Sequence, residues 1–194
     1  MTELEKMAGG QIYDAAGSRE LLELRDRCKD LCHRFNQLLP SQHREQEELL
    51  RQIFASAGES PVVTAPFWCD YGFHITVGDN FYANHNCVIL DTAPVTFGHN
   101  VMIGPNCCFA AAAHPLDLRR RRAGLEFSRP IAVGDDVWFG ANVTVLPGVT
   151  IGAGSVIGAG SVVSRDIPAG VIAVGTPCRP VRPIPAEEEQ EALR

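Results

Sequence analysis

The chain has 194 residues, 45% of them hydrophobic and 7% aromatic, which fits one domain or one domain with an appendage. A formal net charge of −6 disfavours a nucleic-acid role, and no apolar run approaches the ~20 residues that span a bilayer. The charged N-terminus lacks the apolar centre of a signal peptide, and seven cysteines without a secretion signal predict free thiols in a reducing cytoplasm.

The first 60 residues are predicted to form a helical segment. Ser18 is a typical N-cap, and the residues after it place an apolar face at helical spacing. Pro40 and Ser41 end this helix and begin a second one. Residues 18–57 therefore predict a helical hairpin. Because two short helices are unstable alone, the segment 1–60 should pack on the side or end of the remaining chain.

Residues 61–185 carry a repeat of six. Inward-facing apolar residues recur at 77, 83 and 89, slip by two residues near Thr92–Pro94, and resume at 97, 103 and 109. From 131 to 168 the interval is strict, with two series four residues apart: Val133, Phe139, Val145, Ile151, Ile157 and Val163, then Val137, Val143, Val149, Ser155, Ser161 and Ile167. A period of six fits neither a helix nor a free strand. It predicts a parallel β-helix, mainly β in class, whose corners use Gly, Asn and Asp at positive φ.

The repeat fails at about 110–130, where the pattern is replaced by a predicted protruding loop. This loop holds small residues, then His114 and the basic run Arg119–Arg122. Insertions in repeat proteins lie on one face and often carry function. These arginines either belong to an ordinary solvent-exposed loop or attract the phosphates of a nucleotide-type cofactor.

After Pro168 the repeat decays. Residues 175–184 are rich in proline, which cannot continue a ladder, so they should cap the last coil. The Glu-rich residues 186–194 are expected to form a tail.

Metal binding is not expected. Cys28, Cys32 and His33 lie together on the first helix, but a site needs further ligands, and the cysteines also extend the apolar face. Zinc between subunits would require histidines that share one cleft. His74, His85, His99 and His114 are separated by 11, 14 and 15 residues, none a multiple of six, so they need not share one face of the repeat.

Two side chains stand out by position. His114 lies where a strand meets the loop, and a histidine can take a proton from a hydroxyl near neutral pH. Position alone leaves an ordinary loop histidine as the alternative. Trp138 precedes an inward residue and so points outward, where a ligand or a neighbouring subunit would cover it.

The chain resembles the maltose and galactoside O-acetyltransferases over nearly its whole length. The resemblance is carried by PFWCDYG (66–72), GDNFYAN (78–84), VILD (88–91), AHPLD (113–117), GLE (124–126), VWFG (137–140), NVTVLPGVTIG (142–152) and GTPCR (175–179). It implies a left-handed β-helix, acetyl-CoA as donor, a sugar hydroxyl as acceptor, and a homotrimer with active sites between subunits.

Site residues follow from the same resemblance. His114 matches the catalytic base and Asn84 a position at the reaction centre. Acceptor-binding positions are matched by Asp14, Asp70, Asn84, Asp91 and Glu126. The acetyl-CoA groove is matched by Trp138, Ala141, Ala159, Ser164, Arg165, Arg179 and Arg182.

Some residues depart from the family pattern. Ala141 replaces a serine of the galactoside branch, where Asp70 is also a serine, and the arginine run is unusually basic. The departures leave another acceptor open: serine, an antibiotic, an amino sugar or a glycan precursor. Two further alternatives are a metal lyase of the carbonic-anhydrase type and a non-catalytic trimeric scaffold.

Overall fold

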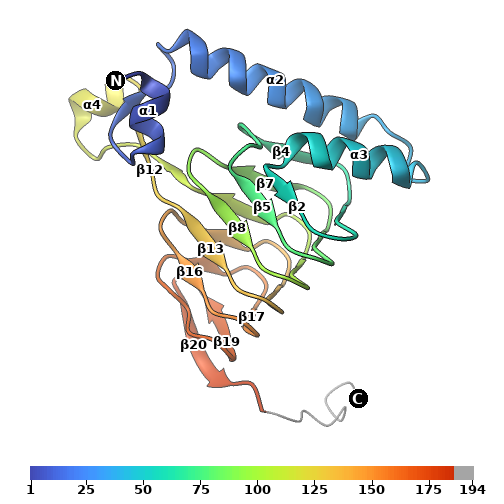
Figure 1. Cartoon of the computed structure of the whole chain (residues 1–194). Helices are drawn as coiled ribbons and strands as arrows, with labels where there is room; N and C mark the ends of the chain where they lie inside the picture. The colour runs from blue at the N-terminus through green and yellow to red at the C-terminus, as the bar shows by residue number, and fades with distance from the viewer. Residues whose placement is uncertain (186–194) are drawn as a thin grey trace.

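A computed structural model describes residues 1–185, so the predicted tail at 186–194 lies outside the described residues (Figure 1). The chain folds as the expected left-handed parallel β-helix, whose coils present three sheets. We name each sheet after one strand. The β5 sheet contains β2 (Ser56–Ala57), β5 (Ile75–Val77), β8 (Val95–Phe97), β13 (Ile131–Val133) and β16 (Thr150–Ile151). The β7 sheet contains β4 (Phe67–Cys69), β7 (Cys87–Leu90), β10 (Cys108–Ala110), β15 (Thr144–Val145) and β18 (Val162–Val163).

The third sheet, the β6 sheet, is the longest and reaches the C-terminal end. It contains β3 (Val62–Val63), β6 (Tyr82–Ala83), β9 (Met102–Ile103), β14 (Trp138–Phe139), β17 (Val156–Ile157), β19 (Val171–Gly175) and β20 (Cys178–Pro183). The proline-rich segment was expected to cap the last coil without continuing the ladder. Instead β20 pairs antiparallel with β19 as the edge strand. Proline is tolerated at that place because an edge strand has one unpaired side.

Strand register explains the irregularities of the repeat. Val88 pairs with Cys108, twenty residues later, which is one 18-residue coil plus the predicted two-residue slip. Cys108 pairs with Thr144, thirty-six residues later, so the loop adds one full coil length without disturbing the stack. Thr144 pairs with Val162 at the plain interval of 18. The extra residues thus leave the solenoid at its corners.

The interior is filled by both predicted inward series, and all twelve of these residues are buried. Aromatic rings pack edge-to-face in the interior, where Phe109 contacts Phe97 of its own coil at 5.0 Å and Phe139 of the next coil at 5.1 Å. At the corners Asn80, Asn100 and Asp136 all have φ near +57°, in agreement with the predicted corner chemistry.

The predicted helical hairpin covers the N-terminal end of the β-helix (Figure 1). It comprises α2 (Arg19–Asn36), capped by the Ser18 side chain, and α3 (His43–Ile53). Asn36 fastens α2 to the first coil, since its side chain donates to Phe67 O at 2.9 Å and accepts from Phe67 N at 2.8 Å.

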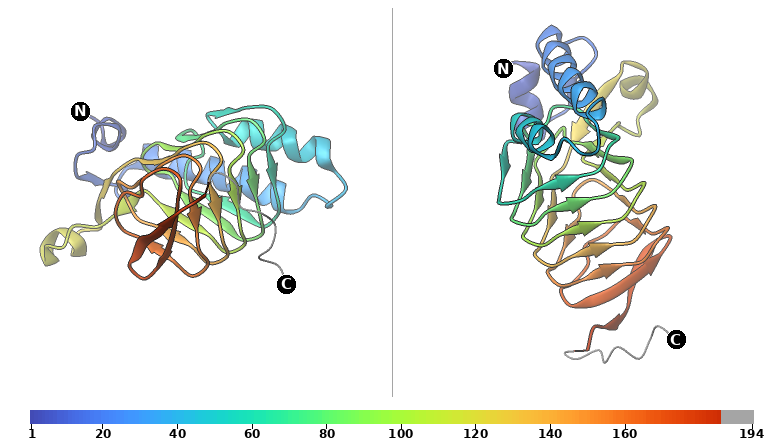
Figure 2. Two further views of the ribbon diagram at one scale, coloured as in Figure 1. Left: turned by 90° about the horizontal axis from the view of Figure 1, so that it is seen from below. Right: turned by 90° about the vertical axis from the view of Figure 1, so that its right-hand side faces the viewer.

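Two further elements have no counterpart in the sequence expectations. A short helix, α1 (Glu3–Ala8), is closed by a capping box between Thr2 and Glu5. A small antiparallel sheet joins β1 (Tyr13–Asp14), β12 (Leu125–Ser128) and β11 (Ala112–Ala113). The loop between β11 and β12 contains the helix α4 (Leu118–Arg122) and stands away from the stacked coils (Figure 2).

Candidate functional site

His114 lies at the base of the protruding loop, directly after β11. Its strand is held by β12, and β12 is held in turn by β1 near the N-terminus. The His114 side chain is exposed, and its Nδ1 lies 2.9 Å from the carbonyl oxygen of Leu125. A carbonyl oxygen only accepts, so Nδ1 must carry the hydrogen. Nε2 of the neutral ring is therefore left with a lone pair facing away from that bond, as a general base requires.

Glu126 is positioned by Tyr13 across the small sheet. The Tyr13 hydroxyl donates to Glu126 Oε2 at 2.8 Å and lies 3.3 Å from Ser128 Oγ, which itself donates to Thr92 Oγ1 at 2.8 Å. Burial raises the pKa of Tyr13, so its hydroxyl stays protonated and able to donate. The Leu125 carbonyl therefore orients His114, and Tyr13 orients Glu126, the residue that follows Leu125. Sequence reasoning missed Tyr13, because only the β1–β12 pairing reveals it.

Asp91 is a buried acid at the corner where β7 ends. Its Oδ1 accepts hydrogen bonds from the backbone N–H groups of Asp70 and Tyr71, at 3.0 and 2.9 Å. Its Oδ2 is buried and has no hydrogen-bond partner. Burial raises the pKa of Asp91 to about 7 against the pull of these donors. Because Asp91 is fully buried, a ligand hydroxyl would reach this unpaired oxygen only if the covering groups moved.

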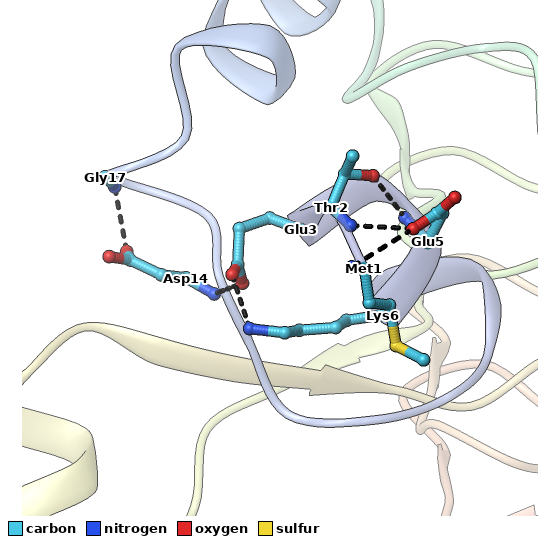
Figure 3. Close-up of polar contacts among 7 residues, drawn as sticks. All are labelled: Met1, Thr2, Glu3, Glu5, Lys6, Asp14 and Gly17. Carbon is cyan, nitrogen blue, oxygen red and sulfur yellow. Dashed lines mark hydrogen bonds and ion pairs between the residues drawn. The ribbon is translucent and has the colours of Figure 1, made fainter.

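Asp70 and Asp14 have different surroundings. Asp70 is half-buried after β4, with Lys29 Nζ 3.4 Å from its Oδ1. Asp14 ends β1, and its Oδ1 accepts from Gly17 N at 2.8 Å, while its backbone N–H donates to Glu3 at 2.6 Å (Figure 3). The second carboxylate oxygen of Asp14 points away from these contacts in Figure 3.

A shallow groove of about 300 Å³ runs over the β6 sheet and brings together three predicted residues, Asn84, Trp138 and Ala141. Trp138 is half exposed, as its outward register predicted, and lies beside Met102 on the neighbouring strand, with Tyr82 in register one strand further on. The Asn84 Oδ1 accepts from His85 N at 2.7 Å, which leaves its amide N–H₂ as a donor toward the groove.

The remaining predicted acetyl-CoA contacts lie farther toward the C-terminal end. Ala159 follows β17 and Ser164 and Arg165 follow β18, all exposed. Arg179 on β20 is exposed and donates to its neighbouring carbonyl, Cys178 O, at 2.7 Å. Arg182, also on β20, donates to Pro183 O at 3.4 Å.

The candidate residues divide between two corners of the β-helix. Asn84, Ala141 and Ala159 follow strands of the β6 sheet, where it turns into the β7 sheet. The other corner follows strands of the β7 sheet and holds Asp70, Asp91, the His114 loop, Ser164 and Arg165. The four residues of β7 alone separate the corners by about 13 Å. One chain therefore does not bring Asn84 and His114 to one point.

Among the described residues, the histidines considered as metal ligands do not gather at one place. His74 and His85 each direct Nδ1 to a different backbone carbonyl, and His99 Nδ1 lies 3.0 Å from Asp79. His33 is exposed and away from Cys28 and Cys32. Instead, the fold places Cys69 against these two cysteines, a contact that sequence spacing could not show.

The arginine run forms α4. Asp117 caps this helix by accepting from Arg120 N at 2.9 Å, and Arg121 Nη1 donates to Leu116 O at 2.8 Å. Leu116 and Leu118 are both exposed. The loop thus presents a basic and partly apolar tip.

Two family models match the chain. The maltose acetyltransferase hexapeptide capping motif matches residues 6–58, and the bacterial transferase hexapeptide repeat matches residues 130–165. Among relatives, a provisionally named acetyltransferase from Staphylococcus aureus is 47% identical, over 100% of this chain and 97% of its own. A provisionally named acetyltransferase from Saccharomyces cerevisiae is 45% identical, over 95% of this chain and 94% of its own.

Three solved structures are similar throughout. A maltose O-acetyltransferase from Clostridium difficile 630 has a TM-score of 0.93 and 44% identity, covering 95% of this chain and 98% of its own. A galactoside acetyltransferase in complex with coenzyme A has a TM-score of 0.92 and 42% identity, covering 95% and 92%. A hexapeptide-repeat acetyltransferase from Vibrio cholerae, complexed with acetyl-CoA, has a TM-score of 0.87 and 43% identity, covering 95% and 100%.

The stacked hexads, together with similarity to acetyltransferases over nearly the whole chain, show a hexapeptide-repeat acetyltransferase. Within that class, the chain belongs to the family of the maltose and galactoside O-acetyltransferases. Across residues 1–185, no helix combines the length and apolar character that crossing a membrane requires.

Proposed function

We propose that this protein moves the acetyl group of acetyl-CoA to a hydroxyl of a maltose-, glucose- or galactoside-like sugar, with His114 as general base. The observation that supports this most is the contact between His114 Nδ1 and the Leu125 carbonyl oxygen, which fixes the tautomer with a basic Nε2. Nε2 takes the proton of the sugar hydroxyl while that oxygen attacks the thioester carbon.

The reaction then passes through a tetrahedral oxyanion. The carbon–oxygen bond to the sugar forms, the intermediate collapses, the carbon–sulfur bond breaks, and His114 returns its proton to the departing CoA thiolate. The oxyanion needs a hydrogen-bond donor, and the amide N–H₂ of Asn84 is free to serve. Because Asn84 and His114 lie at different corners, the Asn84 that serves each site comes from a neighbouring chain.

This geometry supports a homotrimer with a site at each interface. In a cyclic assembly the corner that carries His114 meets the corner that carries Asn84 in the next copy. The outward series Val62, Tyr82, Met102 and Trp138 leaves exposed apolar side chains in register on the β6 sheet, and a second copy would cover them.

The donor and acceptor are assigned to separate parts of that interface. Acetyl-CoA is assigned to the groove residues Trp138, Ala141 and Ala159, together with Ser164, Arg165, Arg179 and Arg182, and the arginines suit its phosphates. The coenzyme A and acetyl-CoA bound in two similar structures support this assignment. Sugar hydroxyls are assigned to the carboxylates of Asp14, Asp70, Asp91 and Glu126, which accept hydrogen bonds.

We also place the enzyme in the cytoplasm. All seven cysteines lie in the described part of the chain and are free thiols, as a reducing compartment maintains them.

The test is loss of the acetyl-CoA thioester with a panel of sugars, comparing wild type, His114→Ala and a control, His43→Ala. His43 is an exposed histidine at the start of α3, away from the loop. We expect turnover with some sugars in wild type and control, and a fall of at least about a hundredfold in His114→Ala. Donor binding without turnover on any sugar would contradict the acceptor class, and an active His114→Ala variant would contradict the general base. If the wild type does not bind acetyl-CoA, the result would favour the alternative of a non-catalytic scaffold.

A further inference from the structure

Three cysteines meet where the helical cap lies on the first coil. Cys28 and Cys32 are one turn apart on α2, and Cys69 is the last residue of β4. The Cys69 Sγ lies 3.3 Å from Cys28 Sγ and 3.6 Å from Cys32 Sγ, and all three sulfurs lie within 4.8 Å of one another. Each cysteine is at most 3% exposed. The remaining free cysteines do not join this group.

The spacing of the sulfurs suits a shared metal ion. A thiolate–metal bond of about 2.3 Å places neighbouring sulfurs ~3.8 to 4.0 Å apart, inside the range seen here. The sulfurs are too far apart for a disulfide, whose bond is about 2.05 Å. Small rotations of the side chains about χ1 would bring the three sulfurs to similar distances.

The chemistry of the site selects the kind of ion. The cluster offers only sulfur, since no histidine, aspartate or glutamate joins it among the described residues. Soft thiolate ligands favour soft ions such as Cu(I). Zinc strongly prefers four ligands, and a buried three-sulfur site offers no fourth.

We propose that Cys28, Cys32 and Cys69 form a binding site for one soft, thiophilic metal ion of the Cu(I) kind. Each thiol that binds as thiolate releases one proton, and the ion then fastens α2 to the first coil of the β-helix. Lys29, next to Cys28 on α2, is paired with Asp70 at 3.4 Å, so the bound ion itself offsets most of the negative charge of the thiolates. The ion enters when α2 opens locally, since the sulfurs are covered in the closed state.

The experiment titrates the fully reduced, full-length protein with Cu(I) under anaerobic conditions against a competing chelator. The variants are Cys28→Ala and Cys69→Ala, and the matched control is Cys87→Ala, which removes an equally buried thiol outside the cluster. We expect one tightly bound Cu(I) per chain in wild type and control. The affinity should fall at least tenfold in the two cluster variants.

Two further readouts keep the outcome clear if an alanine variant folds poorly. Cys32→Ser keeps the shape of the side chain more closely than alanine does, and should also lose affinity with an unchanged circular dichroism spectrum. X-ray absorption on the wild type should show three sulfur neighbours around copper. A wild type that cannot compete with the chelator, or a Cys87→Ala variant that loses as much affinity as Cys69→Ala, would overturn the proposal. Neither result depends on acetyl transfer.

Discussion

Asp91 combines two conditions that rarely coincide in one side chain. Its Oδ1 is held by two backbone donors, while its Oδ2 is buried without a partner. The folded protein therefore favours the neutral acid, with a pKa of about 7 against an ordinary value of 3.8. Because the pKa of Asp91 is higher in the folded than in the unfolded chain, its ionisation lowers the free energy of unfolding. This loss is absent at low pH and grows as pH rises from about 4 to 7. The full cost is on the order of 4 kcal/mol.

Asp91→Asn should therefore stabilise the protein in a pH-dependent way. The amide keeps the acceptor for Asp70 N and Tyr71 N and removes the buried charge. We expect the variant to be more stable than wild type by about 1–4 kcal/mol near pH 8, with little difference near pH 4. Urea unfolding at both pH values measures this. Asp70→Asn, which loses the ion pair with Lys29, should show no such gain, and a pH-independent effect of Asp91→Asn would contradict the account.

The Tyr13 hydroxyl should matter for activity through Glu126. Tyr13→Phe removes the 2.8 Å hydrogen bond that holds the Glu126 carboxylate, so we expect kcat/KM to fall about tenfold and stability to fall by about 1 kcal/mol. Ser128→Ala is the control, because it removes the Thr92 bond and the 3.3 Å contact with Tyr13 but leaves the Tyr13 hydroxyl on Glu126. Kinetics and thermal melting of both variants give the comparison. Equal activity losses would show that Glu126 is not positioned by Tyr13.

At the scale of elements, the corners of the β-helix are joined by side-chain ladders. Asn80 Nδ2 donates to Asn100 Oδ1 at 2.9 Å, and Asn100 Nδ2 donates to Asp136 Oδ1 at 3.0 Å. Each of these residues has a positive φ, which asparagine tolerates better than most residues. The corner thus uses one residue both for its backbone conformation and for bonding between coils.

A pair of substitutions separates these two contributions. Asn100→Gly keeps the backbone conformation and loses the two ladder bonds, and should cost about 1–2 kcal/mol. Asn100→Ala loses the bonds and also strains the backbone, and should cost a further ~1 kcal/mol. Thermal or urea unfolding measures both. An alanine variant as stable as the glycine variant would show that the positive φ is not a constraint.

The repeat was predictable because each coil contacts only its neighbours. The hexad spacing specified the buried series, and the two-residue slip reappeared as coils of twenty residues. Ser18 was predictable for the same reason, since a helix cap is a local interaction. The β1–β12 pairing joins residues more than 110 positions apart, and the Cys32–Cys69 contact depends on how α2 lies across β4. Such contacts leave no periodic signal in one sequence.

The residues proposed for the site could be named from the sequence through family resemblance, and their roles stay predictions. Resemblance to a family pointed to His114 and Asn84. The structure adds the contact of Leu125 with His114 and the hydrogen bond from Tyr13 to Glu126, which orient these two side chains. The division of these residues between two corners was not visible in the sequence, because it depends on which sheet each strand joins.

At the scale of the whole molecule, this division means that a single chain holds two half-sites. One half carries His114, the proposed base, and the carboxylates proposed to bind the acceptor, and the other carries Asn84 and the groove beside Trp138. A cyclic trimer would bring unlike halves together three times with one type of interface.

The most direct measurement is the activity of mixed trimers built from two inactive variants. His114→Ala and Asn84→Ala would be co-expressed with different affinity tags, and trimers that contain both chains isolated by successive purification. Each mixed trimer then has one interface with both residues intact, so we expect about one third of the wild-type acetyl transfer, while each variant alone is nearly inactive. Mixed trimers no more active than the separate variants would contradict a site completed by two chains.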